Sequence, residues 1–141
     1  MEHYRKLERM YYASPINDYF KPVLHVGEGE AEVSIVVRED FHHAAGGMHG
    51  CVYFKALDDA AFFAANSLVE EFFVLTAQFE IELLRPVVEG SIRAVGRVTK
   101  EGERRISAQA ELFDGDGQLV GRGKGLFARS SLRLEAEVHY A

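Results

Sequence analysis

The stretch from Gly50 to Ser67 constrains the fold most, because it is the only long helical pattern in the sequence. It contains no proline, and alanine, the strongest helix former, occurs at five of its positions. Apolar residues fall on every side of it, so we expect a helix that is buried on most of its surface. Its polar residues Lys55, Asp59 and Asn66 share one stripe, and Asp58 lies just beside that stripe. A carboxylate at the margin of an apolar helix face calls for an explanation.

Outside this helix, alternation of apolar and polar residues predicts β-strands. The run from Phe72 to Leu84 is the clearest case, since apolar residues alternate with glutamates until Pro86 stops the strand. Short turns separate the later strands, which favours an antiparallel meander. The turn at 114–117, Asp-Gly-Asp-Gly, is expected to close a hairpin rather than bind calcium, because Gly125 stands where an EF-hand has its bidentate glutamate. The expected elements are an amphipathic helix at 2–13 and strands at 19–26, 31–38, 72–84, 91–100, 106–112 and 118–129.

These elements make an α+β fold: a short N-terminal helix, one long central helix and an antiparallel sheet of about five or six strands. The length of 141 residues suits one domain, so we expect a single domain at 1–141 with its core at about 20–129. The tail at 130–141 also alternates, and it can form either an extra edge strand or an arm that binds a partner. A helix on one face leaves the other sheet face needing cover, which favours a homo-oligomer.

The net charge of −6 argues against nucleic acid as a partner, because phosphate binding requires a basic surface. The single cysteine excludes an internal disulfide and a Cys-x-x-Cys metal site. No apolar run reaches the roughly 18 residues that a membrane span needs, and the first residues lack the apolar core of a signal peptide. We therefore expect a cytoplasmic protein that does not enter membranes.

A set of residues before and along the central helix, together with a hydroxyl on the next strand and the residues that end that strand, resembles the pattern of a known family. In chain order these residues are His43, Gly46, Gly47, His49, Gly50, Cys51, Asp58, Thr76, Leu84, Arg85 and Pro86. The pattern resembles the hot-dog fold acyl-CoA thioesterases, in particular those related to the phenylacetate-degradation enzyme and the hydroxybenzoyl-CoA thioesterases. The resemblance covers roughly residues 20–129. It also has departures: His43 stands where the family usually has Asn, Cys51 replaces the second Gly of His-Gly-Gly, and Thr76 stands where Ser is common.

The resemblance implies hydrolysis of an acyl-CoA, or of an acyl-carrier-protein thioester, without a cofactor or a metal. Asp58 is then the nucleophile or the general base, and the Gly50 N–H at the positive end of the helix polarises the thioester carbonyl. Thr76 can position the water, and His43 can hold the thioester or the base. His49 is expected either in the catalytic loop or as a hydrogen-bonded anchor of that loop.

The resemblance also implies that a second copy of the chain contributes to each site, because the family's sites lie at a dimer interface. Gly50 and Asp58 of one site can then come from different subunits, and we expect a dimer or a dimer of dimers, that is, a homotetramer. Surface cations are expected to hold the phosphates of coenzyme A. The residues assigned to substrate or coenzyme A binding are Gly47, Cys51, Arg85, Arg122 and Lys124.

Other interpretations stay open. The protein can bind an acyl-CoA without turnover, act as a hydroxyacyl-thioester dehydratase that uses a histidine with Asp58, or serve as a structural oligomer. Asp58 and Thr76 also have structural interpretations, and Asp59 is expected to form a surface ion pair with Lys55. Cys51 near the helix start is a conceivable nucleophile. A zinc site could be drawn from His42, His43, His49 and Asp58.

Overall fold

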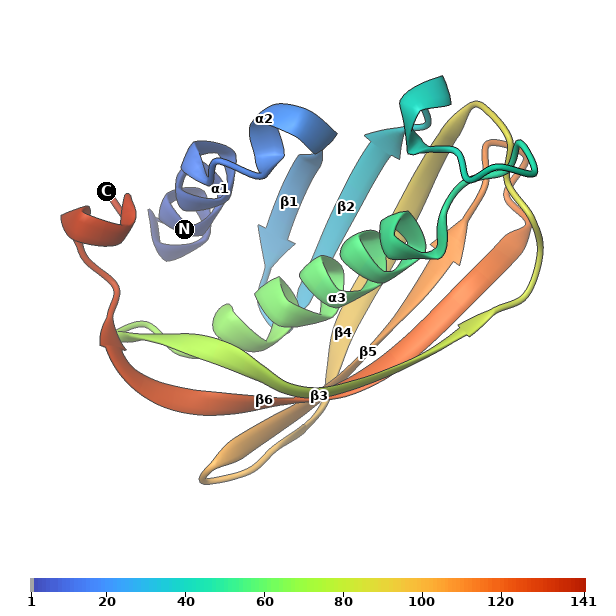
Figure 1. The fold of residues 1–141 in the computed structure, drawn as a ribbon. Helices are drawn as coiled ribbons and strands as arrows, with labels where there is room; N and C mark the ends of the chain where they lie inside the picture. The colour runs from blue at the N-terminus through green and yellow to red at the C-terminus, as the bar shows by residue number, and fades with distance from the viewer. Residues whose placement is uncertain (1) are drawn as a thin grey trace.

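The computed structural model describes residues 2–141, so only Met1 of the expected domain lies outside it. The helical segments are α1 (Glu2–Ala13), α2 (Asn17–Phe20) and α3 (Gly50–Asn66), with short 3₁₀ turns η1 (Glu39–Phe41) and η2 (Ala136–Val138). The strands are β1 (Val23–Gly27), β2 (Glu30–Val36), β3 (Phe72–Leu83), β4 (Ser91–Glu101), β5 (Arg105–Phe113) and β6 (Leu119–Arg133). Within the described residues these strands form one antiparallel sheet in the order β1-β2-β4-β5-β6-β3. The sheet curves around α3, which confirms the predicted α+β architecture (Figure 1).

Helix α3 packs directly onto the sheet because small residues line its contact face. Ala56, Ala60, Ala61 and Ala64 are fully buried. At Gly96 of β4 the contact is so close that an added Cβ would lie 2.4 Å from the Ala60 carbonyl group. The predicted helix, buried on most sides, is therefore confirmed, and it ends one residue earlier than expected.

Asn66 at the end of α3 is fully buried and does not belong to an exposed polar stripe. Its side-chain amide donates to the carbonyls of Val69 and Phe72, and its side-chain oxygen accepts from the Val74 N–H. These bonds satisfy backbone N–H and C=O groups in the turn between α3 and β3, where no helix or sheet provides partners for them.

The N-terminal helix is confirmed as α1, which buries Leu7, Met10 and Tyr11. The strand predicted at 19–26 is wrong at its start, because residues 17–20 form the short helix α2 and β1 begins at Val23. After Pro15 the chain makes a further helical turn, which Lys21 ends in the left-handed region at φ 50°.

The C-terminal tail does not form an extra edge strand, which was one of the two possibilities for it. Strand β6 continues through Arg133, which pairs with Phe72, and the tail then ends in η2 beside α1 (Figure 1). The Nδ1 atom of His3 lies 2.7 Å from the Tyr140 hydroxyl, so the tail is fastened to the N-terminal helix. The alternation at 131–134 therefore reflects one long strand rather than two.

The sheet face away from α3 is polar, so the argument that it needs cover does not hold. Ion pairs cross it between neighbouring strands, at 2.7 Å between Arg93 and Glu32 and at 2.8 Å between Arg122 and Glu82. The turn at 114–117 is a hairpin turn as predicted, closed by the Asp114 carboxylate, which accepts from the N–H groups of Asp116 and Gln118.

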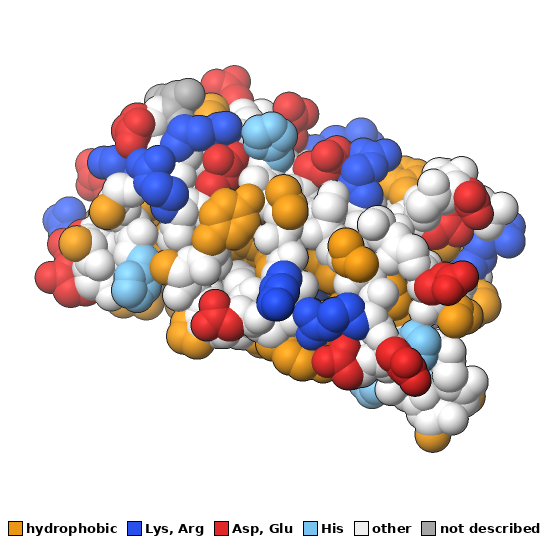
Figure 2. Space-filling view, turned by 90° about the horizontal axis from the view of Figure 1, so that it is seen from above, with side chains coloured by type: hydrophobic (Ala, Val, Ile, Leu, Met, Phe, Trp, Pro, Cys, Tyr) orange, Lys and Arg blue, Asp and Glu red, His pale blue; other side chains and the backbone are white. Residues whose placement is uncertain are grey.

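Neither a membrane-spanning helix among residues 2–141 nor a continuous basic surface on the face drawn in Figure 2 is present. Among residues 2–141, no helix has both the length and the apolar character to cross a bilayer. On the face in Figure 2, Lys and Arg side chains are interspersed with Asp and Glu rather than gathered into one patch.

Candidate functional site

The start of α3 presents a free N–H group. His49 is the N-cap residue: its backbone is extended (φ −63°, ψ 145°), and its Nδ1 accepts from the Cys51 N–H at 2.9 Å. The His49 carbonyl accepts from the Val52 N–H at 3.0 Å. Within residues 2–141 the Gly50 N–H has no acceptor, although it lies at the positive end of the helix dipole. A ligand oxygen could occupy that position.

The loop before α3 forms a hollow beside this N–H group. A tight turn at Gly46, with φ +87°, brings the Gly47 carbonyl onto the His43 N–H at 2.9 Å. His43 Nδ1 accepts from the Ala45 N–H at 3.1 Å, which fixes its ring over Gly47. His43, Gly47, Gly50 and Arg85 line one hollow of about 280 Å³.

Asp58 and Thr76 lie at a second cavity, of about 470 Å³, that α1, α3 and β3 enclose. The Thr76 hydroxyl donates to Asp58 Oδ1 at 3.0 Å. The remaining wall is mostly apolar and includes Phe62, Phe73 and Leu75. A carboxylate at the rim of an apolar cavity can meet a water and an acyl group together.

Burial of Asp58 raises the pKa of its carboxyl group to about 6. The negative charge of Asp59 also raises it, whereas the Thr76 hydroxyl and then the Lys55 ammonium group lower it. Burial dominates because water no longer solvates the charged form. A carboxylate with a pKa near 6 can accept a proton at neutral pH and is a suitable general base.

The two hollows are separate within one chain. Gly50 and Asp58 are eight residues apart on α3, which places them about 12 Å apart along the helix axis. A reacting carbonyl group needs its hydrogen-bond donor and its base within about 3 Å. The structure therefore groups Gly50 with His43, Gly47 and Arg85, and it groups Asp58 with Thr76 elsewhere.

Cys51 and His49 are tied to the helix start. Cys51 is exposed at the second position of α3, and His49 uses Nδ1 to cap the helix, so this nitrogen is not available as a base for the thiol. His49 therefore caps the helix, as an anchor of the loop would, and its part in catalysis stays a prediction. In the part of the chain that the structure describes, no group of three or more His, Cys, Asp or Glu side chains could hold a metal ion.

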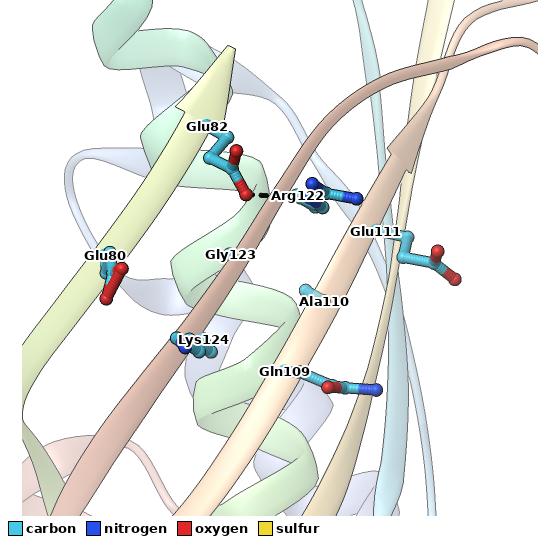
Figure 3. Close-up of a pocket in the computed structure, with 8 residues that line it drawn as sticks. All are labelled: Glu80, Glu82, Gln109, Ala110, Glu111, Arg122, Gly123 and Lys124. Carbon is cyan, nitrogen blue, oxygen red and sulfur yellow. Dashed lines mark hydrogen bonds and ion pairs between the residues drawn. The ribbon is translucent and has the colours of Figure 1, made fainter. Parts of the chain in front are cut away.

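Arg122 and Lys124 lie on the outer face of the sheet and do not join either hollow (Figure 3). Arg122 Nε donates to Glu82 at 2.8 Å, and two further glutamates, from β3 and β5, line the same depression. Carboxylates outnumber cations there, so the depression attracts a phosphate poorly. Arg85 is the predicted cation that faces the Gly50 hollow.

Lys55 and Asp59 lie in a less exposed environment than their sequence pattern indicates. Their side chains are only 11% and 18% exposed, so the expected surface pair is wrong. Lys55 Nζ donates to Asp59 Oδ2 at 2.6 Å, and the Tyr11 hydroxyl donates to the same oxygen at 2.6 Å. The i,i+4 spacing predicted the pair, but nothing in the sequence showed that α1 would cover it.

The fold has close counterparts among known proteins. The sequence model of the thioesterase superfamily matches residues 45–121, more than half of the chain. The chain therefore belongs to the thioesterase superfamily. This match begins within the loop, after His43, includes α3 and β3, and ends before Arg122; it does not include α1.

Individual relatives agree with this assignment. A candidate esterase from Saccharolobus solfataricus is 28% identical over 115 residues, which are 82% of this chain and 82% of that protein. The structure of conserved protein PA5202 from Pseudomonas aeruginosa matches with a TM-score of 0.79 and 30% identity over 86% of this chain and 98% of that chain. The E. coli PaaI protein from the phenylacetic acid degradation operon has a TM-score of 0.85 at 19% identity, covering 94% and 96% of the two chains. The predicted hot-dog fold is confirmed.

Proposed function

We propose that this protein is an acyl-CoA thioesterase in which Asp58 is the general base. Membership of the thioesterase superfamily and an esterase relative support hydrolysis of an ester or a thioester. The observation that carries the assignment is the Asp58 carboxyl group, whose pKa burial raises to about 6 beside an apolar cavity. The resemblance, and Arg85 in the lining of the Gly50 hollow, support coenzyme A as the thiol rather than a carrier protein.

In the proposed reaction, the Asp58 carboxylate removes a proton from a water that the Thr76 hydroxyl helps to orient. The water oxygen attacks the thioester carbonyl carbon, and the resulting oxyanion accepts a hydrogen bond from a Gly50 N–H. The C–S bond then breaks, the thiolate leaves and takes the proton, and the products are a free acid and a thiol.

A second copy of the chain must supply the Gly50 N–H, because one α3 cannot bring both groups to one carbonyl. Strand β3 supports a dimer: among residues 2–141 no strand pairs with its outer edge, and Leu75 and Leu83 are exposed on it. Two copies joined there would bring helix starts and Asp58 cavities of different chains together. The assembly that we propose is therefore a homodimer, or a tetramer built from two such dimers.

Thiol release from a panel of short, long and aryl acyl-CoAs tests the proposal, with the wild type and Asp58→Asn compared. Asparagine keeps the shape and the Thr76 bond but cannot accept the proton, so we expect the rate to fall by about 10²-fold or more. Full activity in the variant would exclude Asp58 as the base. Binding of acyl-CoA by the wild type without thiol release would favour the non-catalytic binding protein, and water loss from a 3-hydroxyacyl-CoA would favour the dehydratase.

A further inference from the structure

Beside Asp58 lies a buried ion pair that the proposed reaction does not use. Lys55 and Asp59 contact each other at 2.6 Å, and Tyr11 from α1 donates to the same carboxylate oxygen. Lys55 Nζ also lies 5.1 Å from the centre of the Tyr11 ring and 5.4 Å from that of Phe20. Three helices, α1, α2 and α3, therefore hold this pair in one geometry.

Stability alone does not explain the pair. Removing two charges from water costs more free energy than most pairs recover, and apolar replacements of similar size are often neutral or stabilising. A tyrosine packed on an apolar α3 would fasten α1 equally well. Burial, and then the Asp59 charge, raises the pKa of Tyr11, so its hydroxyl stays protonated and donates. The unit thus consists of a fixed anion and a fixed cation at the wall of the Asp58 cavity.

All three residues line the cavity that contains Asp58. The titratable groups that face Asp58 are Asp59 and Lys55 from α3 and Tyr11 from α1, while β3 contributes only the neutral Thr76 hydroxyl. The Asp59 charge and the Lys55 charge act on the Asp58 carboxyl group in opposite directions. Because both side chains are mostly shielded from water, solvent screens them less than it would screen exposed charges.

We propose that Tyr11, Asp59 and Lys55 form a positioning unit that holds one negative and one positive charge at fixed distances from the Asp58 carboxylate. The unit rests on the proposed function, since its role is to set the pH range in which Asp58 works as a base. Tyr11 lies outside residues 45–121, so this chain completes the unit with a segment beyond the part that matches the family.

The pH dependence of kcat/KM tests the unit with Asp59→Asn, Lys55→Met and the double variant. Asp59→Asn keeps an acceptor for both donors but removes the negative charge, which lowers the pKa of Asp58. We therefore expect the acid limb, the part of the kcat/KM profile that falls at low pH, to move to lower pH by about half to one unit. Lys55→Met removes the positive charge, and the acid limb should move up by a similar amount. The double variant should return close to the wild-type limb, and Lys55→Arg, which keeps the charge, should also stay near it.

If the role of the unit were purely structural, the variants would have a lower melting temperature or a lower kcat/KM. Asp59→Asn and Lys55→Met would then not move the acid limb in opposite directions. Glu32→Gln is the matched control, because it removes the carboxylate of an exposed ion pair on the outer sheet face and should not move the limb. If Lys55→Met does not fold, the isosteric Asp59→Asn decides, together with a ¹³C NMR titration of the Asp58 carboxyl group. If the wild type hydrolyses thioesters through Asp58 but the acid limb does not move in these variants, this inference is overturned and the proposed function stands. If the wild type does not hydrolyse any thioester, the proposed function is overturned.

Discussion

Asp58 is a carboxylate kept in an environment that disfavours its charge. Its pKa in the folded protein is raised to about 6, above the ordinary value of 3.8. Between about pH 4 and pH 6 the folded state therefore holds more protons than the unfolded chain, and stability falls as the pH rises through this window. Above pH 6 the folded protein carries the full cost of the charged Asp58 carboxylate. The proposed role of Asp58 as a base requires this charged form.

Asp58→Asn should consequently stabilise the protein at pH 8 while it abolishes hydrolysis. The shift sets an upper limit of about 3 kcal/mol, and the partial exposure of Asp58 to solvent reduces the expected gain to about 1–2 kcal/mol. Urea unfolding of both proteins at pH 8 and at pH 3.5 measures this gain, which should disappear at the lower pH because both side chains are then neutral. A variant less stable than the wild type at pH 8 would contradict the assigned environment.

Individual site residues could be predicted from the sequence only where a local pattern marks them. Asp58 stood out as a carboxylate at the edge of an apolar helix face, and Gly50 as the first residue of that helix. The contact of Tyr11 with Asp59 joins residues 48 positions apart, and no local pattern encodes it. For the same reason the outward direction of Arg122 and Lys124, away from the hollows, became visible only in the sheet (Figure 3).

At the scale of elements, the close contact between α3 and β4 depends on one glycine. An alanine Cβ at Gly96 would approach the Ala60 carbonyl to 2.4 Å, and this neighbour is backbone that cannot rotate away. Because the helix would have to move off the sheet, Gly96→Ala should cost about 3 kcal/mol or more in unfolding free energy.

Gly115→Ala is the matched control in the hairpin turn, where the nearest atom to an added Cβ is a carbonyl oxygen at 3.9 Å. This change should stay within about 0.5 kcal/mol of the wild type, or stabilise slightly by restricting the unfolded chain. Thermal unfolding of both variants gives the comparison. Equal stabilities would mean that α3 does not rest on β4 as described.

Most elements could be predicted because their periodicity is strong. The predictions that failed did so for identifiable reasons. The strands at 72–84, 91–100 and 106–112 agree with β3, β4 and β5 to within a few residues. Periodicity does not specify which strands become neighbours, so the pairing of β3 with β6 rather than with β4 could not be predicted. The helix α2 was missed because a single turn of four residues carries too short a pattern.

At the scale of the whole molecule, the proposed mechanism divides each site between two chains. The Gly50 N–H and the Asp58 carboxylate are too far apart along α3 to meet one carbonyl, and β3 leaves a long edge free for a second copy among the described residues. The proposed catalytic unit is therefore a dimer.

Gly50→Pro isolates the N–H from the rest of the helix start. Proline is tolerated at the first helical position, and His49 already has the extended backbone that a residue before proline prefers. Gly50→Ala is its control, because it keeps the N–H and brings its Cβ only to 3.4 Å from the flexible Leu83 side chain. We expect Gly50→Pro to lose about 10²-fold or more in kcat, and Gly50→Ala to retain most of it.

Mixing subunits of Asp58→Asn and Gly50→Pro tests the shared site most directly. Each parent should be nearly inactive, but a mixed dimer contains one site with an intact Gly50 from one chain and an intact Asp58 from the other. Random exchange makes about half of the dimers mixed, so thiol release should recover to about a quarter of the wild-type rate. No recovery, with mixed dimers demonstrated by native mass spectrometry, would contradict a site built from two chains.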